Sequence, residues 1–212
     1  SVSLGDGTKA LGENTVALGK ESVANGIYSL AQGYQSYANG ISSIAMGYQA
    51  KACAPYSISL GRNTYSSGSN SIAMGFKAKS NSISSIAISN SKIDLWGNEL
   101  PPATAIGESS IAMGHSVKAI GQHSIAIGTN KNAANPVTLS SNLGSIAIGV
   151  SVTSSGQYSV SMGRQTTASG GHCIATGYKT WAYGDNSTAM GRWTEARSYG
   201  ETTLGIFNKD VT

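Results

Sequence analysis

Short apolar segments recur along the chain every 14 residues, and nearly all end in glycine. A strong phrase, Ser-Ile-Ala-x-Gly with variations, has fourteen copies, and a weaker phrase, xxAxG, lies midway between most of them. Segments of five residues with period-2 patterning and glycine at their ends are typical of strands. Two strands and two turns per 14 residues predict one coil of a parallel β-solenoid, with about fourteen coils in all. The strong phrase ends at Gly5, Gly19, Gly33, Gly47, Gly61, Gly75, Ser89, Gly114, Gly128, Gly149, Gly163, Gly177, Gly191 and Gly205.

Two stretches interrupt the 14-residue interval. They lie at about residues 90–103 and 129–144, and both contain Pro, Asn and Gly. This composition is typical of surface loops, so both stretches are predicted to be loops inserted into the solenoid. The repeat continues on either side of them, and residues 1–212 are predicted to form a single domain.

The residue two places before the closing glycine is small, usually Ala or Ser, in both phrases. Because side chains alternate between the faces of a strand, these residues predict a thin interior between two sheets. The neighbours of the small residue in the strong phrase are large and apolar, and must then point outward. They are Val16, Leu18, Leu30, Ile44, Met46, Ile58, Leu60, Ile72, Met74, Ile86, Ile88, Ile111, Met113, Ile125, Ile127, Ile146, Ile148, Val160, Met162, Ile174 and Met190.

This outward apolar stripe predicts self-association, with the stripe as the oligomer interface. Monomeric proteins rarely expose large contiguous apolar patches. Burying one large apolar side chain contributes about 1.5–3 kcal/mol, far more than the methyl of an interior Ala. The expected cover is the same face of identical chains, and the alternative is a separate domain that covers the sheet.

The SIAMG and xxAxG phrases resemble the head domain of trimeric autotransporter adhesins, the YadA-like heads, over nearly the whole chain. The resemblance implies an all-β, left-handed parallel β-roll, three chains around one axis, and binding of host extracellular matrix or cell-surface proteins. It also implies a place on the bacterial cell surface, with an outer-membrane anchor outside this chain. The left hand and the number three come from the resemblance alone, because parallel crossovers are normally right-handed.

Composition and charge argue against several other classes of protein. The net charge is +4, but the 14 Lys and Arg residues are scattered, so no nucleic-acid partner is expected. No apolar run approaches the roughly 20 residues that span a bilayer. No phosphate loop or catalytic constellation occurs, and His115, His123 and His172 are predicted to lie in turns. The sequence therefore predicts a protein that is not an enzyme and that holds no cofactor and no metal.

Two columns of side chains on the outside of the coils are candidate ligand surfaces. On the outer face of the weak strands the column is Tyr37, Lys51, Tyr65 and Lys79. Stacking would place neighbours about 4.8 Å apart, and the alternative is that they merely cover one another. Trp96, in the first inserted loop, either packs on the roll or contacts a ligand or another chain. The second column follows the strong glycines and is Lys20, Tyr34, Tyr48, Arg62, Phe76, Arg164, Tyr178 and Arg192.

Cys53 and Cys173, the only cysteines, fall about eight coils apart and are predicted not to pair. Cys53 is expected to be exposed and Cys173 to face inward. For function, the sequence favours an adhesive head. A structural spacer or phage-type tail fibre is the alternative, and an ice-binding solenoid is disfavoured because Lys, Tyr and Trp occupy positions where a flat Thr array would be needed.

Overall fold

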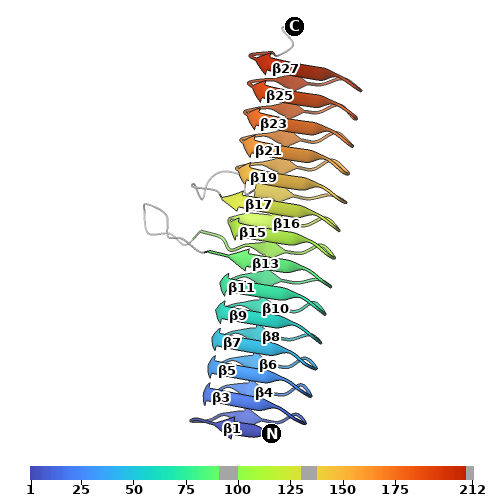
Figure 1. The fold of residues 1–212 in the computed structure, drawn as a ribbon. Coiled ribbons are helices and arrows are strands. Elements are labelled where there is room, and N and C mark those ends of the chain that lie inside the picture. Colours follow the sequence, from blue (N-terminus) through green and yellow to red (C-terminus); the bar gives the residue numbers. More distant parts are fainter. Residues whose placement is uncertain (91–99, 130–137, 209–212) are drawn as a thin grey trace. The chain divides into compact units, whose positions relative to one another are not determined.

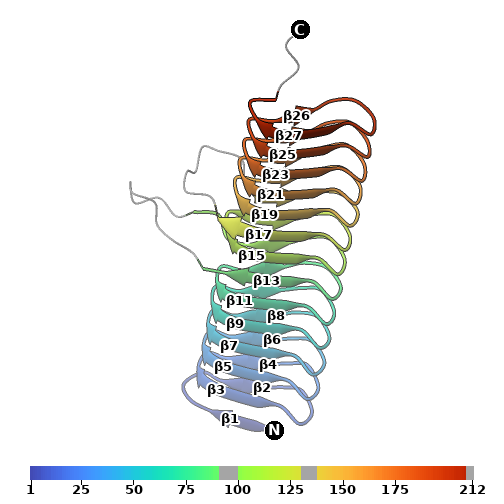
Figure 2. The ribbon, with the colours of Figure 1, turned by 45° about the horizontal axis from the view of Figure 1, so that its top comes forward.

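The computed structural model describes residues 1–90, 100–129 and 138–208. These residues form 27 β-strands and no helix, and the chain divides into two compact units. The first comprises Ser1–Ser91 with Pro102–Ser109, and the second Lys92–Pro101 with Ser110–Thr212. Within each unit, long and short strands alternate along the chain and stack into two parallel sheets (Figures 1 and 2).

The first unit contains seven long and seven short strands. The long strands are β1 (Val2–Leu4), β3 (Val16–Lys20), β5 (Leu30–Tyr34), β7 (Ile44–Tyr48), β9 (Ile58–Arg62), β11 (Ile72–Phe76) and β13 (Ile86–Ser89). The short strands are β2 (Lys9–Ala10), β4 (Val23–Ala24), β6 (Tyr37–Ala38), β8 (Lys51–Ala52), β10 (Tyr65–Ser66), β12 (Lys79–Ser80) and β14 (Thr104–Ala105). Each strand pairs with its counterpart in the next coil, and the partners are 14 residues apart, as in Tyr37↔Lys51, except where β12 pairs with β14 across the first interruption and Lys79 is the partner of Thr104.

The second unit contains seven long and six short strands. The long strands are β15 (Ile111–His115), β17 (Ile125–Thr129), β19 (Ile146–Val150), β21 (Val160–Arg164), β23 (Ile174–Tyr178), β25 (Thr188–Arg192) and β27 (Thr202–Ile206). The short strands are β16 (Val117–Ala119), β18 (Thr138–Ser140), β20 (Thr153–Ser154), β22 (Thr167–Ala168), β24 (Trp181–Ala182) and β26 (Glu195–Ala196).

The predicted all-β parallel β-solenoid is confirmed, with about thirteen coils rather than fourteen, because fourteen long strands are joined by only thirteen short ones. Within each unit the chain runs to the left along the near sheet of Figure 1 and returns along the far sheet as the coils rise. This winding is left-handed, as the resemblance implied.

The interior is as thin as the sequence predicted. The buried apolar residues are nearly all Ala, among them Ala17, Ala31, Ala126 and Ala175, each 0% exposed. Buried Ser and Thr side chains fill the links between strands, and many donate to nearby backbone carbonyls. Ser159 Oγ, for example, lies 2.6 Å from Ser154 Oγ and donates to the carbonyl of Gly156 at 2.7 Å. This hydrogen bonding offsets the cost of burying the hydroxyls that take part in it.

The tight links use a left-handed residue that is usually not glycine. Tyr28, Gln35 and Ser42, seven residues apart, have φ of 59°, 49° and 51°. A left-handed non-glycine residue costs about 1–2 kcal/mol. Each one donates its backbone N–H to a carbonyl of the preceding coil; Gln35 N, for example, lies 2.9 Å from Lys20 O. This repeated bond offsets the cost and fixes the stacking of the coils.

The strong glycines serve a different purpose from these links. Gly47 has φ +134°, and a Cβ placed there would lie 2.0 Å from the carbonyl oxygen of Gly61 in the next coil. Two effects therefore exclude a side chain, the backbone conformation and the close approach of the next coil.

The second inserted loop is shorter than predicted. Residues 138–140, placed by the sequence within the loop at 129–144, form the short strand β18, with Thr138 and Ser140 buried. Asn142 stands in the place of the weak glycine, which is why the phrase was missed. In the first interruption Ala103 is fully buried, and its carbonyl accepts from Lys79 N at 3.1 Å. The loop at 90–103 therefore ends before Ala103.

We expect Gly47→Ala to lower the free energy of unfolding by about 3 kcal/mol, because the new methyl overlaps backbone that cannot move away. Gly200→Ala is the matched control. Gly200 has φ +65°, but no atom lies within 4 Å of its added Cβ, so the cost there is about 1 kcal/mol. Thermal and denaturant unfolding of both variants measure the difference, and equal losses would contradict the close-approach argument.

Candidate functional site

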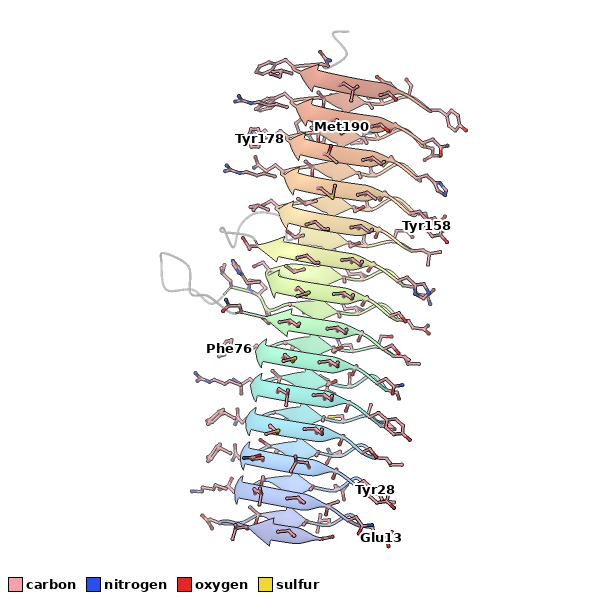
Figure 3. The ribbon with its side chains drawn as sticks, viewed as in Figure 1. Glu13, Tyr28, Phe76, Tyr158, Tyr178 and Met190 are labelled. Atoms are coloured by element: carbon pink, nitrogen blue, oxygen red, sulfur yellow. The ribbon has the colours of Figure 1, made fainter. Side chains whose placement is uncertain are left out.

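The outer face of the long strands carries the predicted apolar stripe in both units. None of the 21 residues assigned to the interface by sequence is buried. Met74, Met162, Ile174 and Met190 are the most exposed, at 38–42%, and Figure 3 shows the Met190 side chain on the open face of its sheet. Polar residues interrupt the stripe at Gln32, Thr176 and Thr188.

The short strands of the first unit bring Tyr37, Lys51, Tyr65 and Lys79 into one column. The parallel register pairs each with the next: Tyr37 with Lys51, Lys51 with Tyr65 and Tyr65 with Lys79. These four side chains line an open trough of about 600 Å³, together with Gln35, Gln49, Asn63, Thr64 and Asn81. The sequence predicted the column, but the trough and its amide wall were missed.

Hydrogen bonds and a cation–π contact order the trough. Gln49 Nε2 donates to Gln35 Oε1 at 2.9 Å, and Gln35 Nε2 donates to Glu21 Oε2 at 2.6 Å. Lys51 Nζ lies 5.8 Å from the centre of the Tyr37 ring, within the distance at which an ammonium is attracted to an aromatic face. Side chains at equivalent positions of successive coils thus support one another and form a continuous wall.

The short-strand face is less polar than the sequence indicated. Leu11, Ile106, Ile120 and Tyr183 occupy the position just before the weak glycine and are 39–64% exposed. Asn, Ser and Cys occupy the same position in the coils that form the trough. Coils away from the trough carry either kind of residue at this position, since Asn25, Ser155 and Ser169 are also polar.

The corner column that follows the strong glycines forms aromatic and cationic stacks. In the first unit the Tyr34 and Tyr48 rings stack at 5.0 Å, and the Arg62 guanidinium lies 5.4 Å from the Phe76 ring. Figure 3 shows Phe76 projecting from the edge at which the long strands end, and Tyr28 and Glu13 from the opposite edge of that unit. These contacts fit the alternative in which the column's residues cover one another.

The second unit adds aromatic residues that the sequence prediction did not single out. The Trp193 ring lies 6.3 Å from Phe207 and 6.2 Å from Trp181, and Lys179 Nζ lies 4.0 Å from its centre. Arg164 and Arg192 lie 5.5 Å and 5.7 Å from the Tyr178 ring. Positions 179, 193 and 207 recur every 14 residues, which is the signal that could have identified the cluster.

The remaining predicted residues are placed as follows. Trp96 lies outside the described residues. His123 and His172 lie in turns as predicted. The prediction of a turn at His115 is wrong, because His115 is the last residue of strand β15. The described parts of the chain contain no group of three or more His, Cys, Asp or Glu side chains that could hold a metal ion. They also contain no helix of the length and apolar character needed to cross a membrane.

Both cysteines are free thiols, as predicted. Cys173 is fully buried, and burial raises the pKa of its thiol to about 11. Cys53 was predicted to be exposed but is half-buried. Burial raises its pKa, although a hydrogen bond from Tyr65 and the charge of Lys51 act in the opposite direction.

We expect an alkylating reagent at pH 8 to label Cys53 slowly and Cys173 only after unfolding, because the thiolate is the reactive form and Cys173 is enclosed. The rate at Cys53 should rise between pH 8 and 9, since its raised pKa leaves the thiol mostly protonated there. Mass spectrometry of timed samples measures both rates. Labelling of Cys173 as fast as Cys53 in the folded protein would contradict the assignment.

Comparison with known families identifies the repeat. The fold and its 14-residue coils define a β-solenoid of the head-repeat class. The YadA head domain repeat (2 copies) matches residues 1–22, 24–50, 38–64, 66–88, 105–130, 154–172 and 174–192, which together make up more than half of the chain. The chain therefore belongs to the YadA head family and is an adhesin-like surface protein of a structural, non-catalytic family. No curated protein matches the chain.

Proposed function

We propose that this chain is the head of a non-enzymatic adhesin that acts as a homotrimer on a bacterial surface and binds host extracellular matrix or cell-surface proteins. The anchor in the outer membrane would lie outside these residues. Membership of the YadA head family supports the general role. The observation that carries the binding function is the trough on the short strands, which presents Tyr37, Lys51, Tyr65 and Lys79 from successive coils.

The trimer proposal rests on the outer face of the long strands. The interior holds Ala, Ser and Thr, so the large apolar side chains have no partner inside their own coil. Each one buried between chains contributes about 1.5–3 kcal/mol. Because such apolar side chains recur in coil after coil, self-association would supply stability that the thin interior lacks.

The binding proposal rests on repetition. Weak contacts made by linked, equivalent sites combine into tight attachment without any single strong site. The columns of this head repeat every coil, and a trimer would repeat them three times. Tyr is also among the residues that contribute most to protein interfaces, because it has a large rigid surface with a polar end.

Replacing Ile44 and Ile111 together by Asp should abolish assembly, because it would place two charges in a dry interface. Sedimentation velocity measures the oligomer and circular dichroism the folded state. The control replaces Thr104 and Thr167 by Asp on the outer face of the short strands, and it should leave the oligomer unchanged. A folded monomer formed by the unmutated chain would refute the proposal.

Replacing Tyr37, Lys51, Tyr65 and Lys79 together by Ser should leave the oligomer intact while adhesion to matrix-coated surfaces falls. The fall should be steeper than for any single change, because the contacts act jointly. The control changes Thr104, Lys118, Thr153 and Thr167 to Ser at the equivalent position of other coils. Unchanged adhesion of the first variant would rule out the trough as the site, and no adhesion by the intact head would favour a structural spacer.

A further inference from the structure

The trough carries positive charge without a carboxylate to neutralise it. Lys51 and Lys79 are exposed, and no Asp or Glu is among the residues that line the trough. Among the described residues neither lysine forms an ion pair. Glu21 accepts a hydrogen bond from Gln35 at 2.6 Å at one end of the amide wall, but it does not line the trough. The trough therefore attracts an anionic ligand.

The spacing of the charges is set by the coil. Lys51 and Lys79 are two coils apart, with Tyr65 in register between them. At about 4.8 Å per coil, their backbone positions lie about 10 Å apart. Such a ladder suits an extended ligand whose negative groups repeat along its length, since a single small anion would engage only one of the lysines.

The other lining groups recognise hydroxyls and the faces of rings. Amides at Gln35, Gln49, Asn63 and Asn81 both donate and accept hydrogen bonds. Tyr37 and Tyr65 alternate with the lysines and present aromatic surface, on which the C–H faces of a sugar ring can pack. Tyr65 is 38% exposed, so that part of its ring surface is open to a ligand.

The backbone of the trough is closed to β-strand addition by a peptide. The N–H groups of Tyr37, Lys51, Tyr65 and Lys79 all donate to carbonyls of the next coil, at 2.8–3.1 Å. A peptide that binds by strand addition needs an unpaired sheet edge, and these strands lie inside the sheet. Recognition must then come from side chains alone, which favours a ligand rich in hydroxyl groups and charge.

We propose that the trough binds an acidic glycan, a chain of sugars that carries sulfate or carboxylate groups at regular intervals. The inference rests on the proposed adhesive function and assigns its ligand to the glycan part of host surface glycoproteins. Lys51 and Lys79 contact the acidic groups, Tyr37 and Tyr65 pack on sugar rings between them, and the amide wall binds hydroxyls.

The test is calorimetric titration of the intact oligomer with heparin oligosaccharides, N- and O-desulfated heparin, neutral dextran and poly-glutamate. Heparin should bind, desulfated heparin should bind more weakly through its carboxylates, and dextran should not bind measurably. Binding should weaken as salt is raised. Poly-glutamate that binds as tightly as heparin would overturn the glycan assignment in favour of an acidic peptide.

Two variants separate the trough from the general positive charge of the protein. Lys51→Gln with Lys79→Gln should weaken heparin binding by about tenfold, as expected for loss of hydrogen bonds to charged groups. Lys9→Gln with Lys118→Gln removes two charges from the same position of other short strands and should change affinity less than about twofold by the same measure. An equal loss of heparin affinity in both variants would mean that heparin is attracted by the general positive charge, and it would overturn the trough as the binding site.

A third variant tests sugar stacking, and an adhesion assay separates this inference from the proposed function. Tyr65→Leu should weaken heparin binding while leaving inorganic sulfate binding unchanged, and an unaltered heparin affinity would contradict stacking. Adhesion is then measured on matrix stripped of glycans by glycosidases. Adhesion that persists there but is lost in the trough variant overturns the glycan inference and leaves the adhesin proposal standing. Heparin binding without adhesion to any matrix would overturn the adhesin proposal and leave the glycan site standing.

Discussion

The thin interior is the constraint on which the rest of this structure depends. Two sheets lie so close that the positions between them hold mostly Ala, Ser and Thr, with Cys173 and an occasional Val, and Val117 and Val152 are the largest fully buried side chains among the described residues. Larger residues lie on the outside, apart from Leu100 and Glu195, which are 5% and 8% exposed. The solenoid therefore keeps its order chiefly through backbone hydrogen bonds between coils, whereas most domains rely on a wide apolar core. Because glycines such as Gly47 bring neighbouring coils to within contact of backbone atoms, the stacking itself restricts the sequence.

Stacking places equivalent positions of successive coils in one column, so that the residue type at one position of the repeat determines the character of a whole surface. A Gln at one link would be an ordinary exposed residue, but Gln35 and Gln49 one coil apart form a hydrogen-bonded ladder. The same rule joins Trp193 to Phe207 and Lys51 to Tyr37. A column of like charges would repel, so the alternation of Lys with Tyr on the short strands allows several ammonium groups to share one face.

The fold could be predicted from the sequence because the repeat pattern and the packing requirements of the small residues point to the same structure. Ala and Ser at every inward position could satisfy only two closely packed sheets, and the 14-residue interval fixed the register. It was insufficient where a coil departs from the phrase. Strand β18 was missed because Asn142 replaces the weak glycine, although Thr138 and Ser140 keep the inward pattern. The left-handed link residues were also missed, because Tyr28 and Gln35 give no local signal for positive φ.

One part of the candidate site could likewise be predicted from the sequence, and another part could not. The column of Tyr37, Lys51, Tyr65 and Lys79 can be predicted from the 14-residue repeat alone. The trough also depends on how far the side chains of the adjacent link project beyond the sheet, and this is set by the folded conformation of the link, which the sequence pattern does not give. The apolar stripe and the trough lie on opposite sheets of the same coil, because their strands turn the small residues inward toward each other. One face can therefore serve self-association while the other stays open to a ligand, and substitutions on one face need not disturb the other.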